Sequence, residues 1–262
     1  MNANEKSESD LTTAEMWNEL YRQTTDKDDI FQYVKSNAIY RQTAKFIEAN
    51  RDYFLDADIV ELGCGDSQWL PYFHKRFNCR IAGVDYSEVG IEKAGRRLQR
   101  YNVRGELFHA TIEDFARSST VKYGAVVSFG LLEHFADRAA IYEASVRLLK
   151  DRGVFFAMVP NLDSLNLFWA NRANHKLMTW HISTPMVDVV RELKSNGFEV
   201  LRAGYVGGPR LFAESEIENP IVDFILTGAR KAFNGCGEVI SRFMSINGRS
   251  ISPYYCVTAQ LR

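Results

Sequence analysis

The feature that most constrains the fold is a repeated alternation of short apolar runs and amphipathic stretches between residues 57 and 159. Each apolar run predicts a buried strand, and each stretch with a helical period predicts a helix. Repeats of strand and helix require a parallel sheet with helices on both faces and right-handed crossovers. The predicted strands are Ala57–Leu62, Arg80–Asp85, Gly105–His109, Tyr123–Phe129 and Gly153–Val159, and the predicted helices between them are Gln68–Phe77, Glu88–Arg100 and Asp137–Leu149.

The alternation is flanked by less regular segments. On its N-terminal side, helices are predicted over Leu11–Tyr21, capped by Thr12 or Thr13, and over Ile30–Asn50. After Pro160 no clean period is visible, and the chain is expected to be irregular as far as His181. The remaining predicted elements are a helix over Thr184–Asn196, strands over Phe198–Tyr205 and Tyr254–Leu261, and helical segments over 217–225 and 233–244 in the long connection between those strands.

Composition narrows the class of protein. The 262 residues carry 32 Lys and Arg against 33 Asp and Glu, and this balance argues against a nucleic-acid partner, which a basic face would serve. The N-terminus is polar and lacks the apolar core of a signal peptide, and no uncharged run is long enough to span a bilayer. We therefore expect a cytoplasmic protein. Its four cysteines form no CxxC pair or zinc pattern and are expected to be reduced thiols: Cys64, Cys79, Cys236 and Cys256.

A glycine loop follows the first strand of the alternation. Gly63 and Gly65 flank Cys64, and glycines at this point let a ligand approach the backbone where a strand turns into a helix. Asp85 ends the next strand, where a carboxylate can accept both hydroxyls of an adenosine ribose. The loop and Asp85 together predict an adenosine-containing ligand.

Two residues decide between possible adenosine ligands. A dinucleotide loop of the GxGxxG type needs a third glycine where this chain has Gln68. Glu61 lies two residues before the first glycine, and an acid there disfavours a pyrophosphate but suits a ligand with an ammonium and a sulfonium. A nicotinamide-dependent oxidoreductase is therefore the disfavoured alternative.

Five segments in one order resemble the motifs of class I S-adenosylmethionine-dependent methyltransferases. They are VELGCGDSQWL, GVDYSEVGIEKA, ATIEDF, YGAVVSFGLLEHFAD and LLKDRGVFFAMVPN, which together cover about 56–161. The resemblance implies an α/β fold with a Rossmann-like, seven-stranded, mostly parallel sheet and an antiparallel last strand. Helices would cover both faces, and a helical insertion would be added. It also implies S-adenosyl-L-methionine as the cofactor.

The resemblance assigns cofactor-binding roles by position. The glycine loop, with Cys64 at its centre, would contact the methionine part. The other residues implied are Glu61 at the amino group, Asp85 at the ribose, Tyr86 along the adenosine, Thr111, Ile112 and Glu113 at the adenine, and Ser128 and Phe129 with backbone carbonyls near the amino group. Two positions depart from the family pattern, because Ser67 stands for a glycine and Thr111 for an acid.

Two upstream residues carry alternative interpretations. In relatives, a basic residue at the position of Arg41 pairs with the cofactor carboxylate, but a helix arginine can equally be solvated. Tyr21 resembles a tyrosine that closes over the methyl group in some relatives, and its alternative role is packing on a short helix.

His134 is the expected catalytic residue, since it follows the fourth strand and an imidazole can take the proton of a hydroxyl acceptor. It could instead only pack at the helix start, and Glu133 could orient it or be a surface acid. His175 and His181 are candidate acceptor contacts. Asp137 and Asn161 form no evident ligand cluster, so no metal is expected. The candidate pocket-lining aromatic residues are Trp169, Trp180, Tyr205 and Phe212.

The domain organisation expected from these patterns has three parts. Residues 1–50 form a helical segment that covers the cofactor site, 51–205 with 251–262 form the Rossmann-like domain, and 206–250 form a helical insertion or lid. The apolar residues of the insertion suit a helical cap or a dimer interface, and also a greasy acceptor or peripheral membrane contact. The chain is expected to be a monomer or a homodimer.

The function expected is methyl transfer to a small-molecule acceptor, at oxygen or alternatively at nitrogen. A macromolecular acceptor, protein or RNA, is the main alternative, and a basic groove beside the pocket would favour it. A further alternative is a module that binds adenosine without catalysis. The segment SFGLLEH stands where enzymes that methylate amino groups carry an NPPY-type motif.

Overall fold

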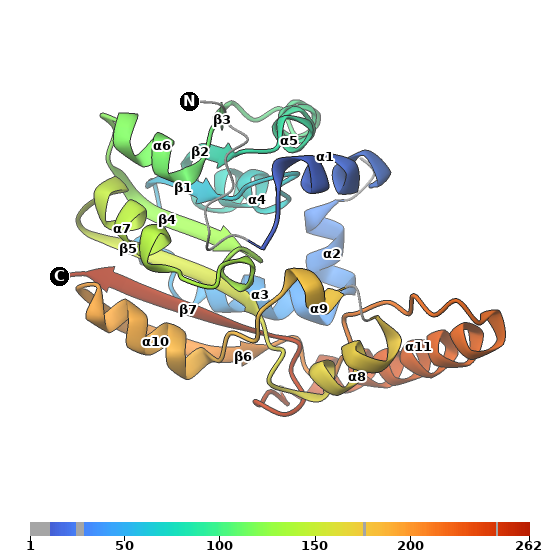
Figure 1. Cartoon of the computed structure of the whole chain (residues 1–262). Coiled ribbons are helices and arrows are strands. Elements are labelled where there is room, and N and C mark those ends of the chain that lie inside the picture. The colour runs from blue at the N-terminus through green and yellow to red at the C-terminus, as the bar shows by residue number, and fades with distance from the viewer. Residues whose placement is uncertain (1–10, 25–28, 175–176, 245) are drawn as a thin grey trace.

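A computed structural model describes residues 11–24, 29–174, 177–244 and 246–262 (Figure 1). Its core is one seven-stranded sheet in the order β3-β2-β1-β4-β5-β7-β6, in which β7 runs antiparallel to both of its neighbours. The expected mostly parallel sheet with an antiparallel last strand is confirmed. The strands are β1 (Asp58–Leu62), β2 (Arg80–Asp85), β3 (Gly105–His109), β4 (Tyr123–Phe129), β5 (Leu149–Pro160), β6 (Phe198–Val206) and β7 (Tyr254–Leu261).

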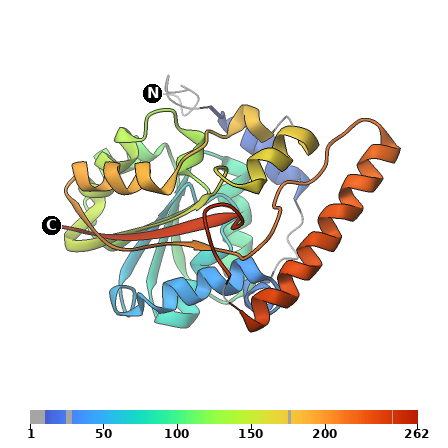
Figure 2. The same cartoon turned by 90° about the horizontal axis from the view of Figure 1, so that it is seen from below.

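Helices pack on both faces of the sheet, as Figure 2 shows. Successive side chains of a strand point to opposite faces, so Val60 joins one core and Ile59 the other. The Val60 core includes apolar residues of α6 (Ile112–Ser118), α7 (Ala139–Leu148) and α10 (Met186–Ser195); the Ile59 core includes those of α3 (Ala38–Glu48), α4 (Trp69–Phe77) and α5 (Glu88–Arg100).

The N-terminal helices differ from prediction at their ends. The first, α1 (Ala14–Gln23), begins after Thr13, whose side chain accepts a hydrogen bond from the backbone N–H of Met16. The single helix predicted over Ile30–Asn50 is wrong, because the chain is broken between α2 (Ile30–Ser36) and α3. Asn37 causes the break: its backbone is extended, and its side chain accepts from the N–H of Ile39 as the cap of α3.

Helices also occur where none was predicted. The stretch after β5 contains α8 (Leu165–Ala173) and α9 (Leu177–Trp180), which the missing apolar period concealed. Polar contacts help to hold α8 in place, since the Trp169 indole donates to the carbonyl of Ala213 over 2.9 Å. A short helix, α6, follows β3 directly, and the 3₁₀ turn η2 (Leu132–His134) follows β4.

The insertion forms one helix rather than two. α11 (Pro220–Phe243) has 24 residues, begins at the cap Asn219 and runs along one side of the molecule (Figures 1 and 2). Its outer side leaves large apolar side chains in solvent, with Phe224 80 % and Phe243 83 % exposed. Within the described part of the chain, no helix has the length and apolar character needed to cross a membrane.

Candidate active site

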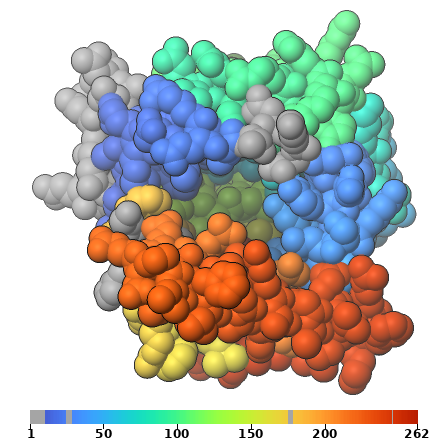
Figure 3. Space-filling model, turned by 90° about the vertical axis from the view of Figure 1, so that its right-hand side faces the viewer, coloured from blue at the N-terminus to red at the C-terminus, as the bar shows by residue number. Residues whose placement is uncertain are grey.

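A cavity of about 1090 Å³ opens at the carboxyl ends of the parallel strands. In the space-filling view it is the hollow between the N-terminal helix and the insertion (Figure 3). We divide it into two parts, which meet near η2. The glycine-loop half consists of Glu61, Gly63, Cys64, Asp85, Tyr86 and 111–114; the insertion half consists of Ile39, Tyr40, Arg210, Leu211, Phe212, Arg230, Asn234 and Tyr254.

Glycine is required at two positions of the loop after β1. Gly63 and Gly65 have φ values of 65° and 41°, in the left-handed region that side chains disfavour. A Cβ atom on Gly63 would lie 2.6 Å from Cδ1 of Leu131, and one on Gly65 would overlap the hydroxyl of Tyr21. Gly63 therefore offers bare backbone to the cavity, whereas Gly65 does not line it and packs beneath Tyr21.

Asp85 fixes the loop from the neighbouring strand. One of its carboxylate oxygens accepts from the N–H of Gly65 and the other from the N–H of Ser87, both over 2.7 Å. Burial raises the pKa of Asp85 to about 6, although these hydrogen bonds favour the charged form. Beside it, the hydroxyl of Tyr86 lies 2.9 Å from that of Thr12. The carboxylate thus sits at the cavity wall with its orientation set by backbone.

Glu61 is a buried acid that lines the cavity. Ser67 donates to it over 2.5 Å, while the Ser67 hydroxyl oxygen accepts from the N–H groups of Trp69 and Leu70. This contact explains why a serine replaces the third glycine, because it joins the acid to the start of α4. Burial, helped by nearby Asp85, raises the pKa of Glu61 to about 8.

Of the candidates expected near the adenine and at the end of the fourth strand, all but Ser128 line the cavity. Thr111 caps α6 by accepting from the N–H of Asp114 over 3.1 Å, and Ile112 and Glu113 line the cavity beside it. Phe129 also lines the cavity, but the side chain of Ser128 is buried and is not part of the wall.

Of the two candidates upstream of the glycine loop, Tyr21 lines the cavity and Arg41 does not. Tyr21 lines the cavity with its hydroxyl over Gly65, and burial raises its pKa. Arg41 does not line the cavity: it pairs with Glu238 of α11, with Nη2 and Oε1 2.9 Å apart. The pairing of Arg41 with a cofactor carboxylate is therefore wrong for this arrangement, as is the solvated alternative. Its side chain instead ties α3 to the insertion.

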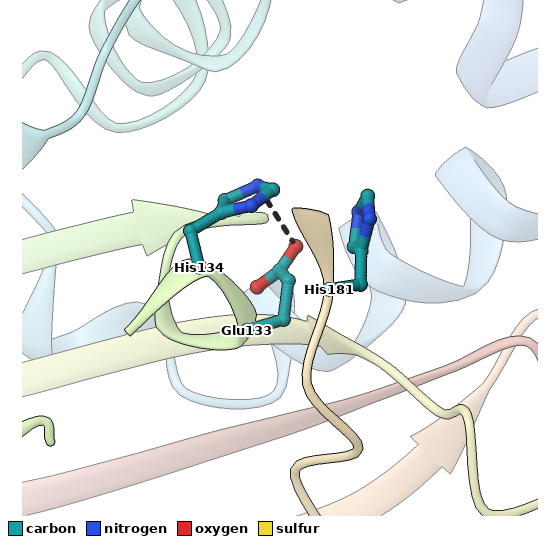
Figure 4. Close-up of side chains that lie close together, drawn as sticks. All are labelled: Glu133, His134 and His181. Atoms are coloured by element: carbon teal, nitrogen blue, oxygen red, sulfur yellow. Dashed lines mark ion pairs between the residues drawn. The ribbon is translucent and has the colours of Figure 1, made fainter. Parts of the chain in front are cut away.

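His134 lies between the two halves, together with Glu133 and His181 (Figure 4). Its Nδ1 donates to the carbonyl of Trp180 over 2.7 Å, and its Nε2 lies 3.8 Å from Oε1 of Glu133. Burial lowers the pKa of His134 to about 4, with nearby His181 adding to this, and burial raises that of Glu133 to about 8. Glu133 is therefore a buried acid rather than a surface one.

The remaining candidates contribute less to the cavity. Asn161 donates to two backbone carbonyls, and Asp137 accepts from the N–H of Ala139; neither lines the cavity. Of the four aromatic candidates only Phe212 does. His175 lies outside the described residues.

The insertion half also contains charged residues that no sequence motif indicated. Arg210 pairs with Glu238 at 3.2 Å and Arg230 with Glu214 at 3.1 Å, while the Nε atom of Arg230 is buried without a hydrogen-bond partner. Asn234 bonds both backbone groups of Leu211 and so fixes the loop before α11 to the helix. The spacing of Arg230 and Asn234, one helical turn apart, was the available signal.

Comparison with known proteins gives a family for this architecture. The chain matches the model of a methyltransferase domain over residues 37–203. It is 24 % identical over 186 residues to a ubiquinone biosynthesis O-methyltransferase of Methylobacterium sp. (strain 4-46), covering 66 % of this chain and 73 % of that protein. For the enzyme of the same name from Neisseria meningitidis (strain Z2491), the match is 27 % over 103 residues and covers 38 % of this chain and only 43 % of that protein.

Solved structures show the same fold at low sequence identity. The magnesium protoporphyrin IX methyltransferase of Synechocystis with bound SAH superposes with a TM-score of 0.56 at 13 % identity, covering 94 % of this chain and 92 % of that one. The geranyl diphosphate C-methyltransferase of Streptomyces coelicolor A3(2) gives a TM-score of 0.55 at 13 % identity, with coverages of 85 % and 77 %.

Proposed function

Because the chain belongs to the methyltransferase domain family and uses S-adenosylmethionine, we propose that it methylates a hydroxyl oxygen of a small molecule. The observation that carries this proposal is the two-part cavity, in which a glycine-loop half meets an insertion half at a buried histidine. Its volume of about 1090 Å³ leaves space for an acceptor beside the cofactor.

The glycine-loop half is the proposed cofactor site. Asp85 accepts the ribose hydroxyls, the loop at Gly63 and Gly65 lies along the methionine part, and 111–113 flank the adenine. Glu61 receives the ammonium group of the cofactor. This assignment is supported by burial, because an acid enclosed without a cation is costly and becomes favourable once a positive ligand arrives.

His134 is the proposed proton acceptor. Since its Nδ1 donates to Trp180, the lone pair of the neutral ring is on Nε2. The acceptor oxygen attacks the methyl carbon in line, the carbon–sulfur bond breaks, and the hydroxyl proton passes to Nε2. The products are a methyl ether and S-adenosylhomocysteine. The protein supplies mainly orientation and exclusion of water, because the sulfonium already activates the carbon.

The proposed acceptor is small because the cavity is covered on two sides. α1 covers the glycine loop through Tyr21 at Gly65 and is held to the start of α5, where Asn18 accepts from Ser87 and Val89. The insertion encloses the other half. We propose that 1–50 and 206–250 act as covers over the domain formed by 51–205 and 251–262. The relatives named above act in ubiquinone biosynthesis, on magnesium protoporphyrin IX and on geranyl diphosphate, which also supports a small acceptor.

The test measures turnover of a panel of hydroxylated aromatic compounds and prenylated phenols. Turnover is followed as the amount of S-adenosylhomocysteine released. We expect His134→Gln to lower kcat about 100-fold with its Kd for S-adenosylhomocysteine changed less than about twofold. His74→Gln is the matched control, since His74 lies on α4 and contacts the carbonyl of Cys79 away from the cavity. Equal kcat for wild type and His134→Gln would overturn the role of His134.

A further inference from the structure

Three side chains at the junction of the two halves form a compact cluster. The carboxylate of Glu133 and the imidazoles of His134 and His181 each offer one ligand atom, and these atoms lie within 4.8 Å of one another. Figure 4 shows the three side chains next to one another. All three residues line the cavity. They come from η2 and from the chain just after α9, so the fold brings together residues that are distant in sequence.

Backbone hydrogen bonds lock the two segments of this cluster together. The N–H of Ile182 donates to the carbonyl of Glu133 over 2.8 Å, and the carbonyl of Trp180 accepts from Nδ1 of His134 over 2.7 Å. His181 is the residue between these two anchors. The backbone on both sides of His181 therefore holds this residue beside Glu133.

Two features of the cluster are those of a ligand-binding site. The Oε2 atom of Glu133 is buried without a hydrogen-bond partner, in a residue only 1 % exposed. An enclosed carboxylate oxygen in this state is costly unless a cation or a donor reaches it. The bond from Nδ1 of His134 to a backbone carbonyl is the outer contact that metal-binding histidines usually make, and it leaves Nε2 with the lone pair.

The identity of the donors indicates which cation fits. Two imidazoles and one carboxylate with a further position open to a cavity is the ligand set of catalytic zinc sites. Imidazole favours Zn²⁺ and related transition-metal ions, whereas Mg²⁺ prefers oxygen ligands.

We propose that Glu133, His134 and His181 bind one divalent cation of the Zn²⁺ type, with an open coordination position toward the acceptor. The role of the open coordination position rests on the proposed function, because the acceptor oxygen is taken to be the ligand that fills it. Nε2 of His134 cannot hold a cation and a proton together. With the cation bound, His134 is a ligand that helps to position the acceptor, and the proton that the acceptor hydroxyl loses on coordination passes to solvent water instead of to Nε2.

The experiment titrates tag-free, full-length protein, stripped of metal by a chelator, with Zn²⁺ in a calorimeter and with Co²⁺ in a spectrophotometer. All variants carry Cys236→Ser, because an exposed thiol can bind these ions. We expect about one equivalent of Zn²⁺ and a visible Co²⁺ absorption typical of nitrogen and oxygen ligands, with Mg²⁺ failing to compete. His181→Gln and Glu133→Gln should each weaken Zn²⁺ binding at least about 30-fold, and His74→Gln should not.

Folding of each variant is checked by its affinity for S-adenosylhomocysteine, whose proposed site does not include His181. Equal Zn²⁺ affinity in wild type and His181→Gln, or no Zn²⁺ bound by wild type, would overturn the proposal. If metal-free protein turns over and Zn²⁺ does not bind, the proposed function stands and the cation site is wrong. If Zn²⁺ binds at these residues but no acceptor in the panel is methylated, the cation site stands and the proposed function fails.

Discussion

The two halves of the cavity are built by different physical means. In the glycine-loop half, backbone groups determine the shape of the wall. Gly63 and Gly65 adopt left-handed conformations, and the carboxylate of Asp85 accepts hydrogen bonds from two backbone N–H groups. In the insertion half, side chains from α11 and the preceding loop supply the wall, and pairs such as Arg230 with Glu214 carry its charge. We therefore expect the first half to admit few substitutions and the side chains of the second to tolerate more without loss of the fold.

The largest effect should come from a side chain on the glycine loop. We expect Gly65→Val to lower affinity for S-adenosylhomocysteine more than about 100-fold, because valine is strained at positive φ and would overlap Tyr21. Calorimetry measures the loss. Gly235→Ala is the matched change in the insertion, where a Cβ meets nothing within 4 Å. It should leave affinity unchanged and stabilise α11 by about 0.5–1 kcal/mol. Similar effects of the two substitutions on affinity would show that the glycine loop is no more sensitive to a side chain than the insertion.

A smaller effect is expected at the second strand end. Asp85→Asn turns one acceptor toward the loop into an NH₂ donor facing the N–H of Gly65 or Ser87. Leaving such a buried donor unpaired costs about 1–3 kcal/mol, so affinity for S-adenosylhomocysteine should fall about 5- to 150-fold by the same calorimetry. An unchanged Kd would mean that Asp85 holds neither the loop nor the ribose.

The proposed contact between Glu61 and the ammonium group should make cofactor binding pH-dependent. With its pKa near 8, the empty site is protonated at neutral pH, and binding an ammonium group requires the proton to leave. Affinity for S-adenosylhomocysteine should therefore rise with pH up to about 8, by as much as about tenfold per unit. Calorimetry in buffers of different ionisation enthalpy should detect the released proton. A flat profile that matches Glu61→Gln would contradict the assignment.

The same group should lower stability as pH rises. The folded protein keeps the Glu61 proton between its ordinary pKa of 4.5 and about 8, where the unfolded chain has lost it. The free energy of unfolding contributed by this group therefore falls as pH increases through that window. We expect Glu61→Gln to have a higher Tm than wild type at pH 8 and a smaller difference at pH 5. A lower Tm at pH 8 would contradict the sign.

The smallest effect on cofactor binding is expected in the insertion half. Arg230→Gln should change affinity for S-adenosylhomocysteine less than about twofold, while raising KM for an acceptor several-fold through the lost wall contact. Steady-state kinetics with an acceptor identified from the panel measures both. Loss of cofactor affinity in this variant would show that the two halves are coupled rather than separate.

Features of the glycine-loop half could be predicted from the sequence because they depend on local patterns. The C-terminal ends of the strands were predicted to within one residue, and Arg80–Asp85 and Tyr123–Phe129 match at both ends, because local apolar runs indicate buried strands. The start of β5 was missed, since this strand begins at Leu149 and was predicted from Gly153. The positions of the glycine loop and Asp85 followed from these strand ends. Both come at the C-terminal ends of neighbouring parallel strands, and such ends meet at one edge of the sheet.

The rest depends on contacts between distant segments. No local pattern predicts that the N–H of Ile182 bonds to the carbonyl of Glu133 and so places His181 beside it. Nor does any local pattern predict that Arg41 pairs with Glu238. The break at Asn37 depended on a side chain competing for backbone, which periodicity does not measure. α11 was predicted as two helices because the apolar pattern lapses around its glycines, although a helix tolerates them.

The central claim is that one cavity places the cofactor in the glycine-loop half and the acceptor in the insertion half. A crystal structure with S-adenosylhomocysteine tests it most directly. We expect the ribose on Asp85, the amino group beside Glu61, and the sulfur facing His134 with open space toward Arg230. A ligand bound in the insertion half, or a sulfur turned away from His134, would contradict it.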